Sequence, residues 1–568
     1  MTGREQTEIE RKYDVEDPTG MPQFADIPSI TAVEAHEPFT LTAVYYDTAD
    51  HDLARRRIVL RRREGGADAG WHIKLPADEG RTEVHWPLSL SGSDDTADAV
   101  PAEVLEAVRA IVRDRVLTPL ARLVTERTTV HLIDAAGSAV AEVADDQVSA
   151  SDARGGTYRK WREWEVELLD GAPDTRKKRT RLLDAVEAAL LAAGARPSAS
   201  VAKIARAVGV ESLTDLPEAP ALPSLLPAAA LQDPGSAGAV VVGALRELTA
   251  TLITLDPAVR ADAPHAVHHL RTTVRRLRSV LAVYSRLFEK TAVTELRTEL
   301  GHLGRQLGRA RDAEVRARRA DAELSAARPH PIDDAHTRLV GGARRDYATG
   351  LEVVRGYLLS SRYYRLLDSL EAFTEWPPVS AQAARPAAAE IKRGLRRAVA
   401  TLNHRTAQVA DADAPEAALH EVRKAARRVR YAAEAVALAE PVLPKVEAAA
   451  ARTGGSKKAI KKALKKAHQK ALAKRASALK RQAKRRRRYA EIGTVAKPLV
   501  KRLGDRHDRL LYTEELEQAA QAAHEAGENT LVYGLLVARA ERPDGTAQNA
   551  LAEAEGTGAR LKTLSRAL

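Results

Sequence analysis

Charged residues recur at every second position near the start of the chain. Glu8, Glu10 and Lys12 lie in TEIERKYDV, a stretch that otherwise has the composition of a β-strand. Strand side chains two positions apart point to the same face, about 6.8 Å from one another, so the three charges share one face. The same spacing recurs in three later stretches: Arg61 with Arg63 in LRRRE, Arg81 with Glu83 in RTEVH, and Glu163 with Glu165 and Glu167 in WREWEVELL.

The simplest interpretation of one charged strand face is that it is solvated. That interpretation requires the opposite face to be apolar, because one face of such a strand packs on the core. The opposite face of the first stretch carries Arg11, and that of LRRRE carries Arg62. Charge on both faces is better explained by a barrel with a polar interior. We therefore expect the repeated charges to line a lumen.

Acids and bases that line one lumen indicate a class of ligand. Carboxylate oxygens bind hard divalent cations such as Mg²⁺ or Mn²⁺. Arginine and lysine bind phosphate oxygens through charge-assisted hydrogen bonds. A polyphosphate bridged to divalent cations needs both sets, and phosphoryl transfer requires mainly positioning and charge neutralisation from the protein. The pattern predicts metal-dependent chemistry on a phosphate chain.

Two kinds of periodicity divide the chain. Residues 1–210 contain about eight stretches with strand alternation and then an amphipathic stretch, TRLLDAVEAALLAAG, which predicts an antiparallel eight-stranded barrel or strongly curved sheet. Residues 211–237 are rich in Pro and Ala and are predicted to be a linker. Residues 238–568 have helical spacing almost throughout. The expected fold class is α+β multidomain, a β-tunnel followed by an all-α domain.

The helical part contains an internal repeat. VHHLRTTVRRLRSVL and LHEVRKAARRVRYAA both fit H-x-x-R-x-x-x-R-R-[LV]-R, 152 residues apart. Each copy places one histidine and three arginines at i, i+3, i+7 and i+10, on one stripe of a helix: His268, Arg271, Arg275 and Arg278, then His420, Arg423, Arg427 and Arg430. A solvated basic face is the commoner explanation for one such helix. The repetition favours a surface that binds a polyanion, because stacked like charges repel unless an anion offsets them.

The amino-acid composition excludes several kinds of functional site and indicates where the protein is located. The chain of 568 residues has no cysteine, which excludes disulfides, thiolate metal sites and cysteine nucleophiles and suits a reducing compartment. No stretch has the pattern of a signal peptide or a membrane span, so we expect a cytoplasmic protein without a membrane partner. The net charge is +12, but residues 456–488 contain 16 Lys and Arg and no acid, so removing them leaves −4 for the rest. This segment is predicted to be an accessory arm for polyphosphate or nucleic acid, or else a solvated spacer.

The first part of the chain resembles the CYTH superfamily, the triphosphate tunnel metalloenzymes. The resemblance follows the family's order from Glu8-x-Glu10-x-Lys12 through YYDT, LRRR, IKLP, Arg81-x-Glu83 and Glu165-x-Glu167 to SVAKIAR, and covers nearly all of residues 5–210. It implies an eight-stranded antiparallel tunnel that holds two divalent cations, Mg²⁺ or Mn²⁺. It also implies inorganic triphosphatase, thiamine triphosphatase, RNA triphosphatase or adenylate cyclase activity.

The resemblance assigns expected roles to individual residues. Lys12 is expected to act in catalysis by stabilising the leaving oxygen, together with the metal-binding acids Glu8 and Glu10. The expected metal ligands are Glu8, Glu10, Asp145, Glu165 and Glu167. The expected triphosphate ligands are Arg61, Arg63, Lys74, Arg81, Arg127 and Lys203.

The helical part resembles the CHAD domain, a helical domain with conserved histidines. The resemblance rests on the two H-x-x-R copies, on GRARDAEV and on LGDRHDRL. It implies two four-helix bundles and a basic surface that binds inorganic polyphosphate. Residues 456–488 would then be an insertion, and an association with polyphosphate granules in the cytoplasm follows as a hypothesis.

Together these patterns predict a metal-dependent inorganic triphosphatase with a polyphosphate-binding helical domain. Its substrate would be tripolyphosphate or a short polyphosphate, because the chain offers only five Trp and four Phe for an adenine pocket. Two alternatives stay open. One is a polyphosphate-binding adaptor whose tunnel is inactive, and the other is an enzyme that processes a nucleotide or thiamine triphosphate, including an adenylate cyclase.

Overall fold

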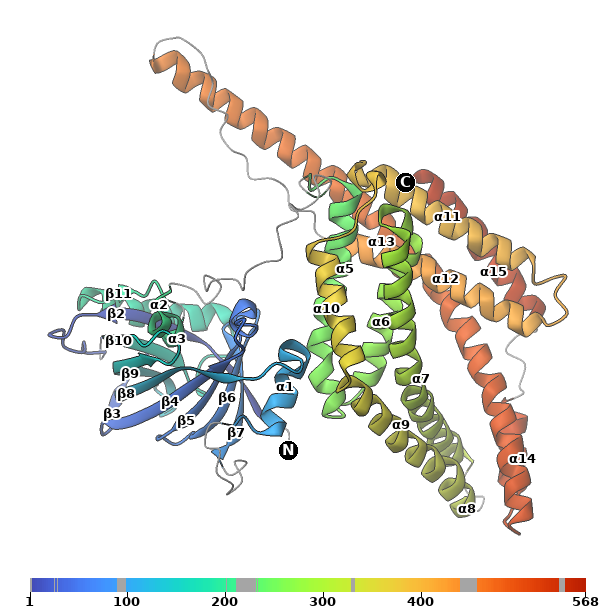
Figure 1. Cartoon of the computed structure of the whole chain (residues 1–568), viewed down its shortest axis with the longest axis horizontal. Coiled ribbons are helices and arrows are strands. Elements are labelled where there is room, and N and C mark those ends of the chain that lie inside the picture. Colours follow the sequence, from blue (N-terminus) through green and yellow to red (C-terminus); the bar gives the residue numbers. More distant parts are fainter. Residues whose placement is uncertain are drawn as a thin grey trace. The chain divides into compact units, whose positions relative to one another are not determined.

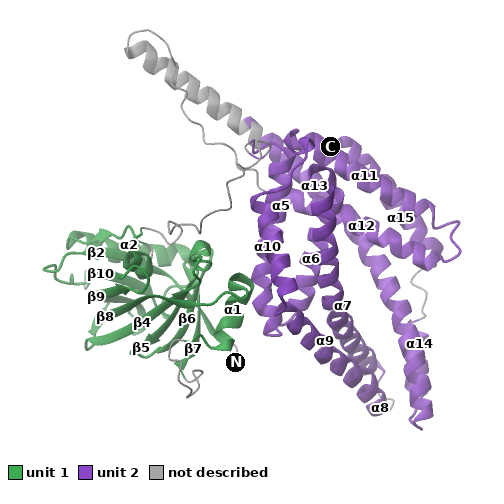
Figure 2. Ribbon diagram, in the orientation of Figure 1, with its two compact units in different colours: residues 1–223 green, residues 224–568 purple. Residues whose placement is uncertain are grey.

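The chain forms two compact units, residues 1–223 and residues 224–568 (Figures 1 and 2). The computed structural model describes residues 3–24, 26–27, 29–88, 99–200, 202–210, 231, 233–327, 332–439, 457–540 and 547–568. Most of the predicted linker, residues 211–237, lies outside this described part of the chain. Each unit is considered by itself below.

The first unit is built on one antiparallel sheet. Its long strands run in the hydrogen-bonded order β1-β7-β6-β5-β4-β8-β9-β10-β2. Their bounds are β1 Arg4–Glu8, β2 Glu10–Val15, β4 Phe39–Asp47, β5 Val59–Glu64, β6 Gly70–Pro76, β7 Arg81–Pro87, β8 Thr118–Ile133, β9 Ala139–Asp152 and β10 Tyr158–Leu168. β1 and β2 stand at opposite ends of this order, yet only Ile9 separates them in the chain. The sheet therefore curls until its ends meet within one run of residues, which confirms the predicted tunnel-like sheet.

The two faces of this sheet differ in chemistry because strand side chains alternate. On β10, Trp164 and Val166 are fully buried in a cluster with Val186 and Leu190 of α2 (Arg176–Ala192), which covers the outer face. The alternate residues of β10, Glu163, Glu165 and Glu167, belong to the inner face. Apolar packing outside thus leaves the inner face for charges.

Smaller elements complete the first unit. β3 (Ala32–Ala35) pairs with β8, and β11 (Arg196–Pro197) pairs with β2. Two short helices are α1 (Ala102–Val112) and α3 (Lys203–Val208). α3 buries Ile204 in the same cluster as the inward-facing Tyr45 and Leu123, so it is held against the lumen.

The second unit is helical, as predicted, and its halves share one pattern of contacts. In the first half α5 contacts α6, α6 contacts α7, and α10 contacts both α5 and α7. In the second half α11, α12, α13 and α15 repeat these contacts in the same order, and α6 packs on α12. The bounds are α5 Ala237–Arg260, α6 Ala266–Val283, α7 Lys290–Ala326, α10 Ser361–Glu375, α11 Ala387–Ala407, α12 Pro415–Leu438, α13 Lys457–Glu525 and α15 Ala547–Ala567. Each half is therefore a four-helix set.

Three further helices extend the halves. α8 (Asp333–Ala335) and α9 (Gly342–Leu358) lie with α7, and α14 (Leu531–Ala540) packs on α13. The Lys- and Arg-rich segment predicted as an insertion forms the first part of α13. One helix, α5, is long and apolar enough to cross a membrane by length and composition, but 56% of its most apolar window is buried, as in the core helix of a soluble protein.

Candidate active site

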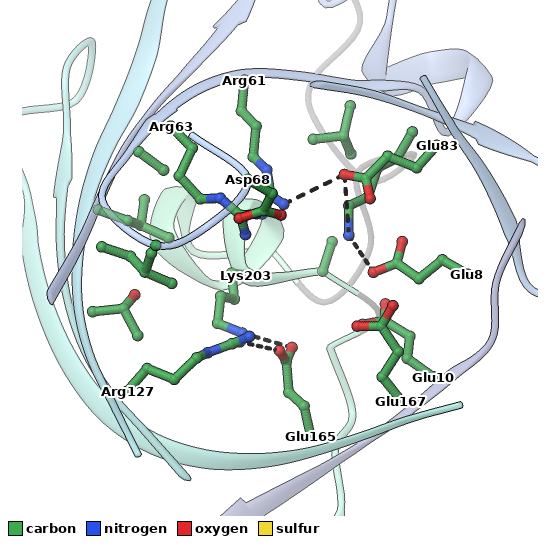
Figure 3. A pocket seen from close by; sticks show the side chains of 18 of the residues that line it. Glu8, Glu10, Arg61, Arg63, Asp68, Glu83, Arg127, Glu165, Glu167 and Lys203 are labelled. Carbon is green, nitrogen blue, oxygen red and sulfur yellow. Dashed lines mark hydrogen bonds and ion pairs between the residues drawn. The ribbon is translucent and has the colours of Figure 1, made fainter. Parts of the chain in front are cut away.

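The inner face of the sheet encloses a cavity of about 290 Å³, shown in Figure 3. Its lining comes from most of the strands and from α3, because the inward positions of neighbouring strands face one another across the tunnel. The lining includes eleven of the site residues predicted for this unit: Glu8, Glu10, Lys12, Arg61, Arg63, Lys74, Arg81, Arg127, Glu165, Glu167 and Lys203. Asp145, also predicted, is not among them.

The carboxyl groups of Glu8, Glu10 and Glu167 lie together on one side of the cavity (Figure 3). Glu10 and Glu167 are direct partners in the register of β2 and β10. Glu8 accepts a hydrogen bond from Lys74, and Glu10 accepts one from Lys12 at 2.8 Å. The second oxygen of Glu8, Oε2, is buried without a hydrogen-bond partner. Among the described residues, no cation lies within ion-pair distance of Glu167.

This crowding of acids changes their protonation. Burial, together with the nearby carboxylates of Glu8 and Glu10, raises the pKa of Glu167 to about 7 against the opposing effect of Lys74. Burial alone would lower the pKa of Lys12, but Glu10 and Glu165 outweigh it and raise that pKa. Lys12 thus stays charged at neutral pH, whereas Glu167 is about half protonated.

A second group of acids lies near the cations of the opposite wall. Arg127 donates two hydrogen bonds of 2.7 Å to Asp146 and one of 2.6 Å to Glu165. Lys203 Nζ lies 2.8 Å from Asp146, 2.9 Å from Glu163 and 2.6 Å from Glu165. Oxygens of Asp146, Glu163 and Glu165 lie within 4.8 Å of one another, a spacing that could hold a metal ion. Two cations compensate this group, and Arg127 and Lys203 both reach Glu165. In the group of Glu8, Glu10 and Glu167, Lys74 pairs with Glu8 and Lys12 with Glu10, and no ion pair to Glu167 is found among the described residues.

Two arginines of β5 face the cavity from another side. Arg61 Nη2 lies 3.5 Å from Glu83, and Arg63 forms an ion pair with Asp68 of the loop between β5 and β6, which lies beside both arginines in Figure 3. Glu83 also accepts from His72 Nδ1 at 2.9 Å. Burial lowers the pKa of Arg63, and the neighbouring Arg61 lowers it further. The cations here repel one another, and a bound anion would relieve that repulsion.

The placement predicted for Asp145 is wrong. Asp145 faces away from the tunnel and accepts two hydrogen bonds from Arg162, at 2.8 and 2.5 Å. Its neighbour Asp146 points inward, is fully buried and binds Arg127 and Lys203. The register explains the difference, because Asp146 pairs with inward-facing Glu163 whereas Asp145 pairs with outward-facing Trp164.

Sequence reasoning assigned no role to several acids in or beside the cavity, among them Asp146, Glu83, Glu163 and Asp68. Asp146 could have been found from parity, because it shares a strand face with Glu142 four positions earlier and Asp145 does not. Glu83 and Glu163 were seen as charged positions, but the bonds of Glu83 to Arg61 and His72 depend on three strands meeting. Asp68 lies in a loop whose course the sequence does not indicate.

In the second unit the two predicted stripes of α6 and α12 meet. Arg271 and Arg423 contribute, with burial, to lowering the pKa of Arg275 and of Arg427, so the four guanidinium groups form one cluster. Arg271 is bound to Asp312 at 2.6 Å, and Arg423 lies 3.7 Å from Asp508. These two acids occupy equivalent places in GRARD of α7 and GDRHD of α13, which extends the internal repeat to a second pair of helices.

The remaining predicted residues of this surface are placed less uniformly. Arg430 is bound to Glu434 at 2.7 Å, whereas Arg278 is surrounded by other arginines that, after burial, lower its pKa. His420 lies beside His507, with ring centroids 4.5 Å apart, and His268 lies beside His269 at 5.6 Å. Burial and neighbouring cations lower the pKa of His268 and of His420. Both histidines are therefore neutral at pH 7.

The chain was compared with family models and with known proteins. A CYTH domain model matches residues 6–193, and a CHAD domain model matches residues 243–451. Two uncharacterized proteins of Mycobacterium tuberculosis, from strains CDC 1551 / Oshkosh and H37Rv, are each 38% identical over 553 residues, which is 93% of this chain and 92% of theirs.

Solved structures also resemble the chain. The CHAD domain from the plant Ricinus communis is 22% identical, covers 56% of this chain and 92% of its own, and has a TM-score of 0.38. A putative adenylyl cyclase from Hippeastrum, described as having a dominant triphosphatase activity, is 20% identical, covers 35% of this chain and 93% of its own, and has a TM-score of 0.23. The family models and the M. tuberculosis relatives show that this chain belongs to the proteins in which a CYTH domain precedes a CHAD domain.

Proposed function

We propose that this protein is a metal-dependent inorganic triphosphatase, which cleaves tripolyphosphate or short polyphosphate in the tunnel of its first unit. CYTH domains typically process triphosphates and are generally metal-dependent. The observation that carries the proposal is one cavity inside the tunnel with two kinds of wall. Glu8, Glu10 and Glu167 crowd one side, and cations that include Arg61 and Arg63 face the remaining space.

The acidic side fits a divalent cation. Glu8 has a buried oxygen without a hydrogen-bond partner. The pKa of Glu167 is raised to about 7, so its carboxyl group is protonated below that pH. A hard cation would satisfy that oxygen and replace that proton, and carboxylate oxygens are the ligands that Mg²⁺ and Mn²⁺ prefer. Glu8, Glu10 and Glu167 would hold it, with Glu165 nearby. When bound, it would polarise a phosphate oxygen and lower the pKa of a water ligand.

The basic residues would bind and orient the substrate. Arg61, Arg63, Arg127 and Lys203 can each donate several hydrogen bonds, and those that now go to acid partners could pass to phosphate oxygens. Lys12 keeps its proton because its pKa is raised, so it can donate a hydrogen bond to the departing phosphate oxygen. Most of these charged side chains are largely buried in the wall of the tunnel, which strengthens their interactions.

The direct test is phosphate release from tripolyphosphate with Mg²⁺ or Mn²⁺ by the full chain. We expect wild type to release phosphate and Glu10→Gln to release it at least a hundredfold more slowly, because the substitution removes a charge from the cation site. Glu64→Gln is a matched control, since Glu64 is exposed at the end of the same β5 that carries Arg63. A wild-type chain that fails to turn over tripolyphosphate, or an equally active Glu10→Gln variant, would contradict the proposal.

One observation favours the second candidate, an organic triphosphate substrate. Phe39 and Leu41 of β4 and Leu123 of β8 also line the cavity, so part of its wall is apolar. A thiamine or nucleobase moiety could pack there while its triphosphate meets the cations. Assays with ATP and thiamine triphosphate, with analysis for a cyclic product, separate this candidate from an inorganic triphosphatase.

We propose further that the second unit binds inorganic polyphosphate through the cluster of Arg271, Arg275, Arg423 and Arg427. The repulsion within this cluster supports the proposal, because a polyanion would offset it. If the tunnel proves inactive while polyphosphate binds, the protein is an adaptor instead. We also propose that the Lys- and Arg-rich start of α13 is an accessory arm that binds polyphosphate or nucleic acid. The proposed location of the protein is the cytoplasm.

A further inference from the structure

One acid–arginine pair is present in one half of the helical unit, and its acid is missing at the equivalent position of the other half. The offset of 152 residues between α6 and α12 makes Arg276 equivalent to Arg428 and Ala282 equivalent to Glu434. In one of these pairings Arg276 Nη2 lies 3.6 Å from Glu434, so an acid compensates the arginine. In the other, Arg428 and Ala282 line a common cavity, and the acid is replaced by a methyl group.

The cavity at this position has a volume of about 250 Å³ and lies between the end of α6, α11 and α12. Three guanidinium groups border it, those of Arg286, Arg397 and Arg428, together with the hydroxyl groups of Ser285 and Thr401. Arg397 Nη1 is buried and has no hydrogen-bond partner. This part of the unit therefore holds a buried, unused guanidinium donor beside a space large enough for a phosphoryl group.

These three arginines lack acid partners within the described part of the chain, where no carboxylate lies within ion-pair distance of them. Burial lowers the pKa of Arg397, and Arg286 and Arg393 lower it further, while Glu390 opposes them. A site in which guanidinium groups repel one another and leave donors unsatisfied is stabilised by an anion.

The cavity adjoins the arginine cluster proposed to bind polyphosphate. Arg428 lowers the pKa of Arg278 on the α6 stripe and that of Arg427 in the cluster, after burial and other neighbours, so it is close to both. Among the described residues, no aromatic side chain lines the cavity, so the aromatic stacking platform that is typical of single-stranded nucleic-acid sites is missing there. An inorganic phosphate chain that leaves the cluster is the ligand that these donors fit.

We propose that the cavity between Arg286, Arg397 and Arg428 is a second phosphate site, which binds one phosphoryl group of a polyphosphate chain that also lies on the arginine cluster. Glu434 closes the equivalent position in the other half, so the binding surface extends at one end only. The inference rests on the polyphosphate binding proposed above. It adds a second site, the phosphoryl group that this site would bind, and the direction in which the bound chain would leave the arginine cluster.

The other half suggests the variant that tests the site. Ala282→Glu places an acid where Glu434 stands in the repeat, and it should pair with Arg428 as Glu434 pairs with Arg276. We expect about tenfold weaker binding of long-chain inorganic polyphosphate by the full chain, and a salt dependence of log K reduced by about one unit. Ala282→Gln, which has the same size without the charge, should bind within about twofold of wild type.

Arg397→Gln provides an independent test, because it removes a donor without adding an acid. It should weaken polyphosphate binding to a similar extent while circular dichroism shows unchanged helix content and tripolyphosphate hydrolysis in the tunnel stays at the wild-type rate. If Ala282→Glu and Arg397→Gln both bind long-chain polyphosphate as wild type does, the second site is refuted and the proposed function stands. If wild type binds no polyphosphate, the proposed role of the helical unit fails and this inference fails with it.

Discussion

The protonation of Glu167 links the geometry of the tunnel to a measurable quantity. Its pKa of about 7 comes from burial and from the nearby Glu8 and Glu10, and a cation bound among these groups would need the carboxylate form. We therefore expect Mg²⁺ or Mn²⁺ binding to release close to one proton at pH 6 and almost none at pH 8.5. Calorimetric titrations in buffers of different ionisation enthalpy measure that proton release.

The control for this prediction is Glu167→Gln, which has no proton to lose. It should show no pH-dependent proton release and weaker cation binding. Proton release that is equal at pH 6 and pH 8.5 in wild type would place the cation away from Glu167, for instance at Asp146, Glu163 and Glu165, where the pKa values of Asp146 and Glu165 are lowered by cations despite burial.

The neighbouring aspartates of β9 offer a second prediction at the scale of residues. Asp146→Asn removes the carboxylate that binds Arg127 in bidentate fashion and also contacts Lys203, so we expect kcat/KM for tripolyphosphate to fall at least tenfold, about 1.4 kcal/mol of transition-state stabilisation. Asp145→Asn should leave kcat/KM within about twofold of wild type, because its bonds to Arg162 lie outside the tunnel. Equal effects of the two substitutions would contradict the placement of these side chains.

Single residues also show where sequence reasoning stops. The alternation of Glu8, Glu10 and Lys12 predicted their common face, and all three line the cavity. Periodicity alone did not separate Asp145 from Asp146, because two adjacent acids leave the choice of face to the pairing register. Some ion-pair partners, such as Lys74 for Glu8, lie 66 residues away in the chain and have no local signal.

At the scale of elements, long strands were predictable and short ones were not. The stretches that became β4 to β10 carry several alternating residues each, so their periodicity stands out. β3 and β11 have only four and two residues. Elements this short are set by their neighbours in the sheet rather than by their own sequence.

Helix α3 shows how a short element can position a site residue. It begins with Lys203, and Gly209 follows its last residue, Val208. Gly209 has a φ of +82°, and a Cβ there would lie 2.5 Å from Arg159 Nη2. Gly209→Ala should destabilise the first unit by about 1–2 kcal/mol from backbone strain, and raise KM for tripolyphosphate by shifting Lys203. Thermal unfolding and steady-state kinetics of the full chain measure the two effects.

Gly194→Ala is the matched control for α3. Gly194 also has a positive φ, +105°, at the end of α2, but a Cβ there would meet no atom within 4 Å. It should therefore cost similar stability without changing KM. A KM that rises equally in both variants would show that general loosening of the first unit, rather than the position of α3, limits substrate binding.

At the scale of the whole molecule, the change from period-two to helical spacing predicted a tunnel followed by a helical unit. The repeat of α6 and α12 likewise predicted two related halves. The sequence did not indicate that Arg276 would lie beside Glu434 or that Arg286, Arg397 and Arg428 would line one cavity. Those features depend on how α6, α11 and α12 pack together, which the repeat itself does not contain.

The two proposed activities belong to different units, so they should be separable by substitution. Arg275→Gln combined with Arg427→Gln removes two cations from the arginine cluster, and we expect at least tenfold weaker binding of long-chain polyphosphate with unchanged hydrolysis of tripolyphosphate. Glu10→Gln should do the reverse. Binding assays and phosphate release on the same full-length preparations measure both quantities.

Hydrolysis of long-chain polyphosphate then reports whether the units cooperate. If the helical unit supplies chain ends to the tunnel, the Arg275→Gln and Arg427→Gln pair should raise KM for long chains and leave KM for tripolyphosphate unchanged, because only the long chain can occupy both binding regions. An unchanged KM for both substrates, together with weaker binding, would mean that the helical unit holds polyphosphate for another purpose. The protein would then combine a triphosphatase and a separate anchor rather than one processing enzyme.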